Sequence, residues 1–531
     1  MTEPAPSAAA PPSMVLVDRH VGFIDELREF IKETGGLPLD RSIALALKRI
    51  PAPTHLPACS SSRRRGRRID RGALEEMAIQ DEIKRYRAEV EEPALAMLLQ
   101  RKASSPSSAA AVRKEPLPEA IDGDGSLYRE LLAGIEPCFS AAVAGAAPPS
   151  VTRLSLEISW PPGRHITSYP MSACIASCHR CFLVLYVGGY RPGVSVHHQP
   201  GFYLVYNASA NSVAIVPPLC VNYSSHCDIG AGVAVLCCSI GDGDCVGSYV
   251  LAELLLHIDS RNFLPTNKAT LFIWDSSSCW WVKRDQLVLP LPADHAADEQ
   301  GTTTCSFHAH LAFAVSFSSI CWVDLRTGIL VYNHIHSEQF HFIPLPEECI
   351  TGKLRNRRSW QGQREPDEYR TMCCLDRQTL KFVSMDESYS QECPMFTSWT
   401  LRRPLSPTNW KWEKDAVSSF CIRDLWDDQL YRDKLLRPLM PRFPVISTQE
   451  PGIIYFSITD DYKHNHSHYV LSFNMDRRRV ESVYEVPSDK NAITLPPRLF
   501  TSDFSSYLNK VLPNSSVPLF PAAVVRTIST I

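Results

Sequence analysis

The stretch Ile320 to Pro346, ICWVDLRTGILVYNHIHSEQFHFIPLP, decides the fold that the sequence predicts. It contains a short apolar run, a turn built on Asp324 and Gly328, a second apolar run and an exit punctuated by prolines. Short runs rich in β-branched and aromatic residues favour buried strands, and Asp and Gly favour chain reversal. The pattern therefore predicts a β-hairpin in which Trp322 is a core anchor and Gly328 has a positive φ.

Similar hairpins recur along the chain. Apolar runs lead into a turn Asp or Asn at Asn207, Asp275, Asp376 and Asn474, with a weaker match at Asp424. From Asp275 to Asp324 is 49 residues, and from Asp324 to Asp376 is 52. A repeat of about 50 residues is the period of kelch-type propeller blades. Dividing residues 151–525 by that period predicts a mainly β fold, a kelch-like β-propeller of about six or seven blades. An irregular β-sandwich is the alternative.

Composition places the packed part of the chain in its C-terminal two thirds. Of the 531 residues 44% are hydrophobic, which is enough for a sizeable core, and no Trp precedes Trp160. We therefore expect a disordered segment at 1–13, a helical region at 14–100, a linker with a short helix at 101–150 and the propeller-like domain at 151–525. The net charge of −3 makes nucleic-acid binding by the whole chain unlikely on electrostatic grounds.

The region 14–100 contains three helical patterns and a basic run. Helices are expected from Asp18, over Leu37–Pro51 and from Asp70. Leu37–Pro51 also resembles the opening helix of an F-box, although the Val-x-Lys/Arg-x-Trp segment expected after it is missing. The basic run is a candidate interaction or nuclear-import tract, and a solvated linker is the equal alternative. Its arginines are Arg63, Arg64, Arg65, Arg67, Arg68 and Arg71.

The eighteen cysteines do not read as a disulfide framework. Several lie inside apolar runs, where Cys acts as a small hydrophobe, as at Cys237, Cys321, Cys373 and Cys421. The N-terminal stretch has neither the basic nor the apolar segment of a secretory signal, and no run approaches 18 apolar residues. These features predict a cytoplasmic protein, with a nuclear pool if the basic run is read by an import receptor.

The stretch Trp322-Val-Asp-Leu325 with Gly328-Ile-Leu330, followed by Phe342-Ile-Pro-Leu-Pro346, resembles the domain of unknown function 1618 family of plants, which is abundant in grasses. Trp399-Thr-Leu401, Leu425-Trp426 and Ile453-Ile-Tyr-Phe456 support the resemblance. It extends from about residue 149 to about residue 507 and is most specific over 322–456. The family implies no established activity, so the resemblance bears on fold boundaries more than on chemistry.

Three clusters carry residue types that bind metals. Cys174, Cys178, His179 and Cys181 lack a second ligand pair at finger spacing and precede an apolar run, which favours core cysteines. His464, His466 and His468 alternate on one strand face, but a solvated hairpin is the preferred interpretation. His308 and His310 have the same spacing. We therefore predict neither a metal site nor a bound cofactor.

Catalytic signatures are missing from the sequence: it contains no nucleophile elbow, phosphate loop or dinucleotide fingerprint. A propeller enzyme would need Arg, His or carboxylate side chains clustered at the blade ends, which linear sequence does not reveal. The sequence thus favours a non-enzymatic scaffold that binds other proteins and no membrane. An F-box-like ubiquitin-ligase adaptor and a propeller enzyme or metal-binding protein are the alternatives.

Overall fold

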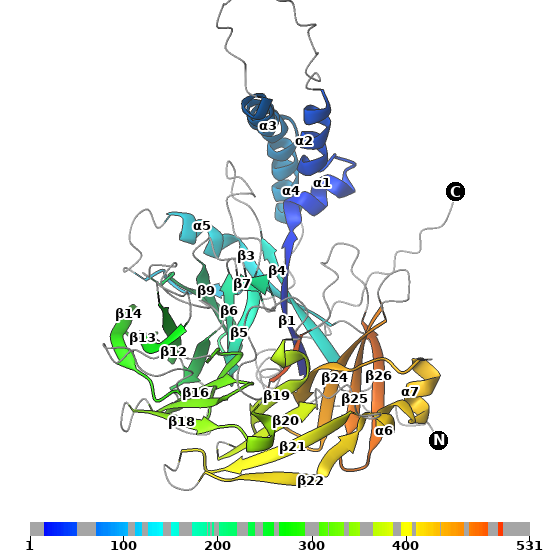
Figure 1. The fold of residues 1–531 in the computed structure, drawn as a ribbon. Coiled ribbons are helices and arrows are strands. Elements are labelled where there is room, and N and C mark those ends of the chain that lie inside the picture. The colour runs from blue at the N-terminus through cyan, green and yellow to red at the C-terminus, as the bar shows by residue number, and fades with distance from the viewer. Residues whose placement is uncertain are drawn as a thin grey trace, which may run out of the picture.

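The computed structural model shows a five-bladed β-propeller with a helical region near its N-terminus (Figure 1). The structure describes residues 15–49, 71–104, 112–118, 126–141, 150–158, 173–187, 190–191, 194–195, 201–219, 232–238, 248–259, 265–292, 307–316, 318–333, 339–350, 365–376, 378–385, 394–405, 410–435, 437–460, 467–486 and 498–502.

Each blade is an antiparallel meander of four consecutive main strands. Blade I consists of β5 (Ala173–His179), β6 (Phe182–Val187), β9 (Phe202–Asn207) and β10 (Ser212–Val216). Blade II consists of β11 (Val233–Cys237), β12 (Tyr249–Ile258), β13 (Pro265–Asp275) and β14 (Trp280–Val288). Blade III consists of β15 (Leu311–Ala314), β16 (Ser319–Asp324), β17 (Gly328–Asn333) and β18 (Phe340–Pro344).

Blade IV consists of β19 (Arg370–Cys374), β20 (Thr379–Met385), β21 (Met395–Arg402) and β22 (Trp412–Cys421). Blade V consists of β23 (Arg442–Ile446), β24 (Ile453–Asp460), β25 (Ser467–Asn474) and β26 (Arg479–Val486). Short helices decorate these two blades, namely η4 (Glu347–Cys349), η5 (Pro366–Glu368), α6 (Ile422–Trp426) and α7 (Gln429–Lys434). The first strand of each blade faces the centre of the ring, because β5, β11 and β15 contact one another, as do β19 and β23.

Blade I continues into strands from both ends of the described chain. β1 (Val15–Asp25) pairs antiparallel with β27 (Leu499–Ser502) and with β5, and parallel with β4 (Ser150–Ile158). β3 (Ile135–Ala141) pairs with β4, and β2 (Arg113–Lys114) adds to the outer strand β10. The ring is therefore closed where β1 and β27 meet between blades V and I. A small hairpin of β7 (Tyr190–Arg191) and β8 (Val194–Ser195) completes the strands.

The helix expected from Asp18 is wrong over its first half, because residues 15–25 form the strand β1. The apolar residues do recur every three or four positions, which suits a helix. The segment is nevertheless bonded to strands on both sides, and sheet context of this kind overrides local periodicity. The helix begins only at Glu26.

The helical region is an insertion between two strands of one sheet, β1 and β2, and it stands away from the ring (Figure 1). Its elements are α1 (Glu26–Glu33), α2 (Leu39–Lys48), α3 (Arg71–Tyr86), the π-helical turn η1 (Arg87–Glu91) and α4 (Glu92–Ser104). Phe30 and Ile31 pack against Leu95 and Leu98 in a small separate core. The short helix expected at Ser126–Ile135 is α5 (Ser126–Gly134). No helix in the described part of the chain is long and apolar enough to span a bilayer.

The expected count of six or seven blades, and the kelch type, are not confirmed, because the described strands form five blades. The 50-residue spacing compared turns that are not equivalent. Asp275 ends the third strand of its blade, Asp324 ends the second, and Asp376 follows the first. The equivalent turns at Asn207 and Asp275 are 68 residues apart, and from Asp275 to Asn474, three blades on, is 199 residues. The blade period is therefore about 67 residues.

Hydrophobic side chains between neighbouring blades hold the ring together. Trp322 is fully buried in a cluster shared by blades II and III, and its indole N–H donates to the carbonyl oxygen of Gly232 over 2.6 Å. A second cluster joins blades IV and V around the stacked rings of Phe396 and Phe420. Burial of these large aromatic side chains is the main favourable contribution to assembly of the ring.

Gly328 does not have the positive φ expected from the sequence; it begins strand β17 opposite Pro344. Glycine is required there for another reason. A Cβ atom at this position would lie 2.5 Å from the carbonyl oxygen of Ile343 and 2.5 Å from the ring of Phe342. The close approach of strand β18, rather than the turn conformation, excludes a side chain. Asp424 also differs from expectation, since it lies in helix α6 and not in a hairpin turn.

Candidate ligand-binding site

A cavity of about 600 Å³ lies at the centre of the ring, and we call it the central cavity. The inner strands β5, β15, β19 and β23 line it, together with residues of β1 and the start of β27. Cavities of 300 to 1,000 Å³ are the usual size of small-ligand sites in proteins. Much of the wall is apolar, including Ile175, Leu311, Phe313, Val315 and Met372.

Arginine and aspartate side chains gather where the ring closes. The backbone N–H of Arg19 in β1 donates to the carbonyl oxygen of Arg498 over 2.7 Å, because β1 and β27 pair at this point. The Arg498 guanidinium donates to Asp367 Oδ2 over 2.5 Å and lies 4.7 Å from the centre of the Phe443 ring. The side chain of Arg19 donates from Nε to the carbonyl oxygen of Ile175 over 3.3 Å. The strand pairing therefore fixes two arginines side by side.

Arg370, the first residue of β19, brings a third guanidinium to the same cavity. It is only 3% exposed, and its Nη1 donates to the carbonyl oxygen of Leu325 over 2.7 Å. Its Nε is buried and has no hydrogen-bond partner among the described residues, and the same is true of Asp367 Oδ1. Buried polar atoms in proteins are bonded in the great majority of cases, so two such atoms three residues apart are unusual.

The charges at this end of the cavity do not balance. Four arginines, Arg19, Arg180, Arg370 and Arg498, and two aspartates, Asp367 and Asp376, line the cavity, so guanidinium groups outnumber carboxylates by two. Guanidinium groups present several N–H donors in a planar fork and bind carboxylates and phosphates strongly when water is excluded. The geometry thus favours an anionic ligand in a partly apolar cavity. We call Arg19, Asp367, Arg370 and Arg498 the arginine cluster.

Two of the side chains that line the central cavity, Cys373 and His179, are candidates for a nucleophile and a base. Burial, with a smaller contribution from the neighbouring Cys374, raises the pKa of the Cys373 thiol to about 12. A thiol with so high a pKa stays protonated at neutral pH and is a poor nucleophile. His179 Nδ1 accepts a hydrogen bond from the backbone N–H of Cys237 over 3.0 Å, so this nitrogen is not available as a general base.

The four residues of the first cluster weighed as a metal site do not converge. Cys174 and Cys181 are fully buried in the core of blade I, whereas Cys178 and His179 line the central cavity. Within the described part of the chain, no group of three or more His, Cys, Asp or Glu side chains is placed to hold a metal ion. Cys421, expected to be a core thiol, is disulfide-bonded.

The histidine pairs have structural surroundings where they are described. His464 and His466 lie outside the described residues, and His468 Nδ1 is 3.1 Å from the hydroxyl oxygen of Thr459. The rings of His308 and His310 lie 4.6 Å apart in an edge contact. His310 Nδ1 lies 3.4 Å from Asp324 Oδ1.

Asp324 organises the β16–β17 turn from a fully buried position. Its carboxylate accepts from the backbone N–H of Arg326 over 2.8 Å and from the hydroxyl of Thr327 over 2.9 Å. The same carboxylate also accepts from the backbone N–H of His308, in the segment before β15, over 3.1 Å. Burial raises the pKa of this carboxyl group, but the hydrogen bond and charge of His310 and the Arg326 N–H outweigh it, so the pKa lies below its ordinary value.

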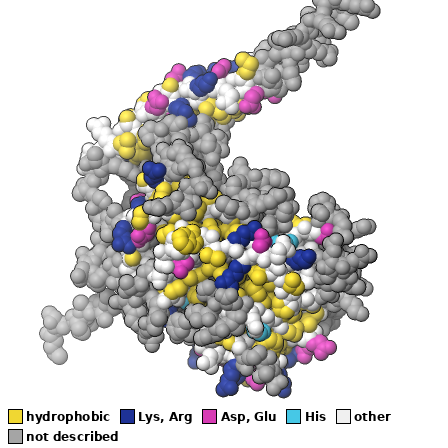
Figure 2. All heavy atoms as spheres, turned by 90° about the vertical axis from the view of Figure 1, so that its left-hand side faces the viewer, with side chains coloured by type: hydrophobic (Ala, Val, Ile, Leu, Met, Phe, Trp, Pro, Cys, Tyr) yellow, Lys and Arg dark blue, Asp and Glu magenta, His cyan; other side chains and the backbone are white. Residues whose placement is uncertain are grey.

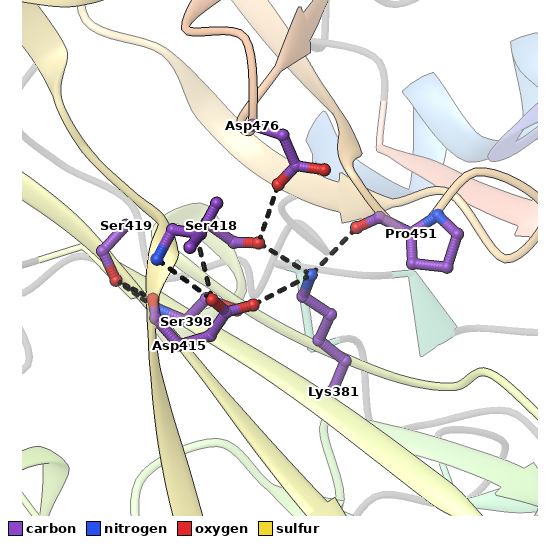
Figure 3. A network of polar contacts seen from close by, with 8 residues as sticks. Lys381, Ser398, Asp415, Ser418, Ser419, Pro451 and Asp476 are labelled. Atoms are coloured by element: carbon purple, nitrogen blue, oxygen red, sulfur yellow. Dashed lines mark hydrogen bonds and ion pairs between the residues drawn. The ribbon is translucent and has the colours of Figure 1, made fainter.

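A second polar network joins blades IV and V (Figure 3). The buried ammonium of Lys381 donates to the carbonyl oxygen of Pro451 over 2.9 Å and to the Ser418 hydroxyl over 3.4 Å, and lies 4.0 Å from Asp415. Ser418 donates in turn to Asp476 over 3.2 Å. Because each charged group has partners from the protein itself, the network is best explained as a clamp between blades.

An exposed apolar surface lies on the outer strand of blade II. Trp280, Val282 and Val288 are 58%, 42% and 67% exposed. Figure 2 views the side of the molecule that carries β14 and shows hydrophobic side chains gathered over the middle of this face. Lys283 and Asp285 interrupt the strand with charge. Scattered exposed hydrophobic residues are normal on protein surfaces, so these three do not by themselves define a site.

The basic run gives no geometry to test. Arg63 to Arg68 lie outside the described residues, and Arg71 is the first residue of helix α3. The segment that resembles an F-box opening forms helix α2, which packs against α3, and Ser42 donates to Glu82 there over 2.5 Å.

Sequence reasoning missed all four residues of the arginine cluster. They are separated by up to 479 positions, from Arg19 to Arg498, and none lies in a recognisable motif. Only the pairing of β1 with β27 and the fold of blade IV bring them together. No local signal in the sequence marks them.

Part of the chain matches a protein-family model. Residues 322–455 match the family model described as protein of unknown function (DUF1618), which confirms the resemblance drawn from the sequence. No curated protein matches the chain. Among solved structures, the periplasmic gluconolactonase of Pseudomonas aeruginosa is similar over 69% of this chain and 99% of its own, with 8% identity and a TM-score of 0.22. So distant a likeness gives no argument about function.

Proposed function

We propose, for a chain that carries the domain of unknown function 1618 over residues 322–455, a non-enzymatic scaffold that binds other proteins through an anionic group held in the central cavity. The arginine cluster is the observation that carries the proposal. Four arginines against two aspartates leave positive charge in a partly apolar wall. Charge-assisted hydrogen bonds from these arginines offset the desolvation of a ligand only if the ligand is negatively charged.

The proposal that the protein is not an enzyme rests on the cavity chemistry. Acid–base or nucleophilic catalysis needs a nucleophile within hydrogen-bond reach of a base. The Cys373 thiol has a raised pKa, and His179 Nδ1 is bonded to backbone. Asp367 is paired with Arg498. Each of the three groups thus has surroundings that do not favour a nucleophile–base pair, and this supports the proposal.

The proposed location is the cytoplasm, with a nuclear pool directed by the basic run. The tract Arg63, Arg64, Arg65, Arg67 and Arg68 supports import because five arginines within six positions attract acidic receptor surfaces. Replacing all five by Ala in a fluorescent fusion should lower the nuclear-to-cytoplasmic ratio. An unchanged ratio would mean that the run is a solvated linker.

Proximity labelling with the full chain tests the scaffold proposal. We would compare wild type with Arg498→Met, which removes a guanidinium from the cavity, and with Arg402→Met as the matched control. Arg402 is 75% exposed on the outer part of blade IV and lies outside the cavity. Circular dichroism melting would first establish that all three proteins are folded.

The expected result is a set of proteins labelled by wild type and by Arg402→Met but lost with Arg498→Met. An equal labelling profile for a folded Arg498→Met protein would refute the proposal that partners bind through the cavity. A covalent turnover product formed by wild type from a cavity ligand would instead refute the non-enzymatic assignment.

A further inference from the structure

The arginine cluster offers both a donor and an acceptor that the described protein leaves unused. Arg370 Nε is a buried N–H donor without a partner, and Asp367 Oδ1 is a buried acceptor without a partner. The two residues are three positions apart, at the start of β19, and both line the central cavity. A ligand that satisfies both must carry an acceptor and a donor close together.

Charge decides which acceptor and which donor fit. The acceptor lies in a cavity whose arginines outnumber its carboxylates, so it is an anion. The donor must bond to the Asp367 carboxylate, which Arg498 holds, so it is an N–H or O–H group. A phosphate monoester dianion supplies acceptors but no such donor, and Asp367 would repel any phosphate dianion. A carboxylate with a neighbouring amide N–H supplies both. That pair of groups occurs at the C-terminus of every polypeptide.

The rest of the cavity wall specifies what accompanies the carboxylate. Beside the arginines lie apolar side chains, among them Ile175, Phe313, Met372, Phe443 and Val445. Binding is favoured when an apolar side chain of the ligand packs on this wall, because both apolar surfaces are then removed from water. The guanidinium of Arg498 already stacks on Phe443, which makes the charged and apolar parts of the wall continuous.

We infer that the central cavity binds the free C-terminal carboxylate of a partner polypeptide whose last residue is apolar. The carboxylate accepts from Arg370 and Arg498, the last amide N–H donates to Asp367, and the final side chain packs on the apolar wall. The inference rests on the proposed function, since it names the part of the partner protein that the cavity takes.

Fluorescence polarisation with the full chain tests the inference directly. The probes are N-terminally fluorescein-labelled hexapeptides that end in Leu, Val or Phe, each made with a free C-terminal carboxylate and with a C-terminal amide. We expect at least one free-acid peptide to bind and its amide to bind about ten- to a hundredfold more weakly, because a charge-assisted pair in a dry site is lost. Arg370→Lys should weaken the free acid about tenfold, because lysine lacks the planar fork.

Two further variants guard against a misfolded Arg370→Lys protein. Ala314→Phe fills the cavity without removing a charge and should abolish binding, whereas Arg402→Met should leave it unchanged. As competitors, N-acetyl-leucine should displace the peptide, and N-acetyl-leucinamide should not. 4-Methylpentanoate, which lacks the N–H, should compete at least several-fold less well if Asp367 accepts from the ligand.

The outcomes separate this inference from the proposed function. Equal binding of acid and amide peptides, or no peptide binding with a proximity profile that still depends on Arg498, overturns the C-terminus assignment and leaves the scaffold proposal standing. Displacement by inorganic phosphate as effective as by N-acetyl-leucine also overturns it. Loss of both the peptide binding and the Arg498-dependent profile refutes the two together.

Discussion

Replacing Trp322 by Ala should lower the free energy of unfolding by about 3–5 kcal/mol, as truncation of large core aromatics does. The side chain is fully buried between blades II and III, with the rings of Tyr332 and Phe340 about 6.5 and 6.3 Å away between centres. Two losses contribute. The cavity left by the indole is the larger, and the Gly232 carbonyl, which accepts from the indole N–H over 2.6 Å, loses its donor at a cost of about 1–3 kcal/mol.

Trp322→Phe separates these two losses, because it removes the N–H but keeps most of the apolar volume. We expect it to cost about 1–3 kcal/mol, clearly less than Ala. The assay is equilibrium unfolding in urea followed by circular dichroism. Trp280→Ala is the matched control, since Trp280 is 58% exposed and its loss should stay within about 0.5 kcal/mol. A Trp322→Ala protein within about 1 kcal/mol of wild type would show that this residue does not join the blades.

Three further predictions concern the turns and the blade clamp. Gly328→Ala should cost about 1–3 kcal/mol in the same urea assay, because the new Cβ would lie 2.5 Å from the Ile343 carbonyl oxygen; an unchanged midpoint would mean that β18 moves away freely. The lowered pKa of Asp324 gives the folded state an advantage above about pH 3.9, the ordinary value, and this advantage is lost as the pH falls through the lower folded-state pKa. The stability gap between wild type and Asp324→Asn should therefore be full at pH 6 and shrink toward pH 2, and a gap independent of pH would contradict this. Lys381→Met should cost roughly 1–3 kcal/mol by leaving the Pro451 carbonyl and Asp415 without their cation; a Lys381→Met, Asp415→Asn double variant that is no more stable than the single one would argue against their coupling.

Much of the fold follows from local pattern. The hairpin around Trp322 was predicted from alternating apolar runs and a turn, and the structure has β16 and β17 there. The blade count could not be predicted the same way. Turns after the first, second and third strands of a blade use the same residue types, since Asp and Asn favour any tight reversal. Asp275, Asp324 and Asp376 therefore look equivalent in sequence although each occupies a different turn.

The candidate site is a product of tertiary structure alone. Arg19 and Arg498 meet only because β1 pairs with β27, and Arg370 reaches them only because blade IV stands in the same ring. The candidate ligands Cys174 and Cys181 are close in sequence, and this closeness reflects one buried hairpin rather than a site. Proximity in sequence marks strands and turns, whereas a propeller builds its centre from one strand of each blade.

The pairing of β1 with β27 also has a consequence for biosynthesis. The strand that closes the ring leaves the ribosome 484 residues after the strand it joins, counted from Val15 to Leu499. At about 5–20 residues per second, β1 waits on the order of a minute for this partner. During that interval one edge of the sheet is unpaired, and such edges template association with other chains. A nascent chain of this protein therefore needs protection until β27 emerges, and a product truncated before Leu499 stays open at the seam.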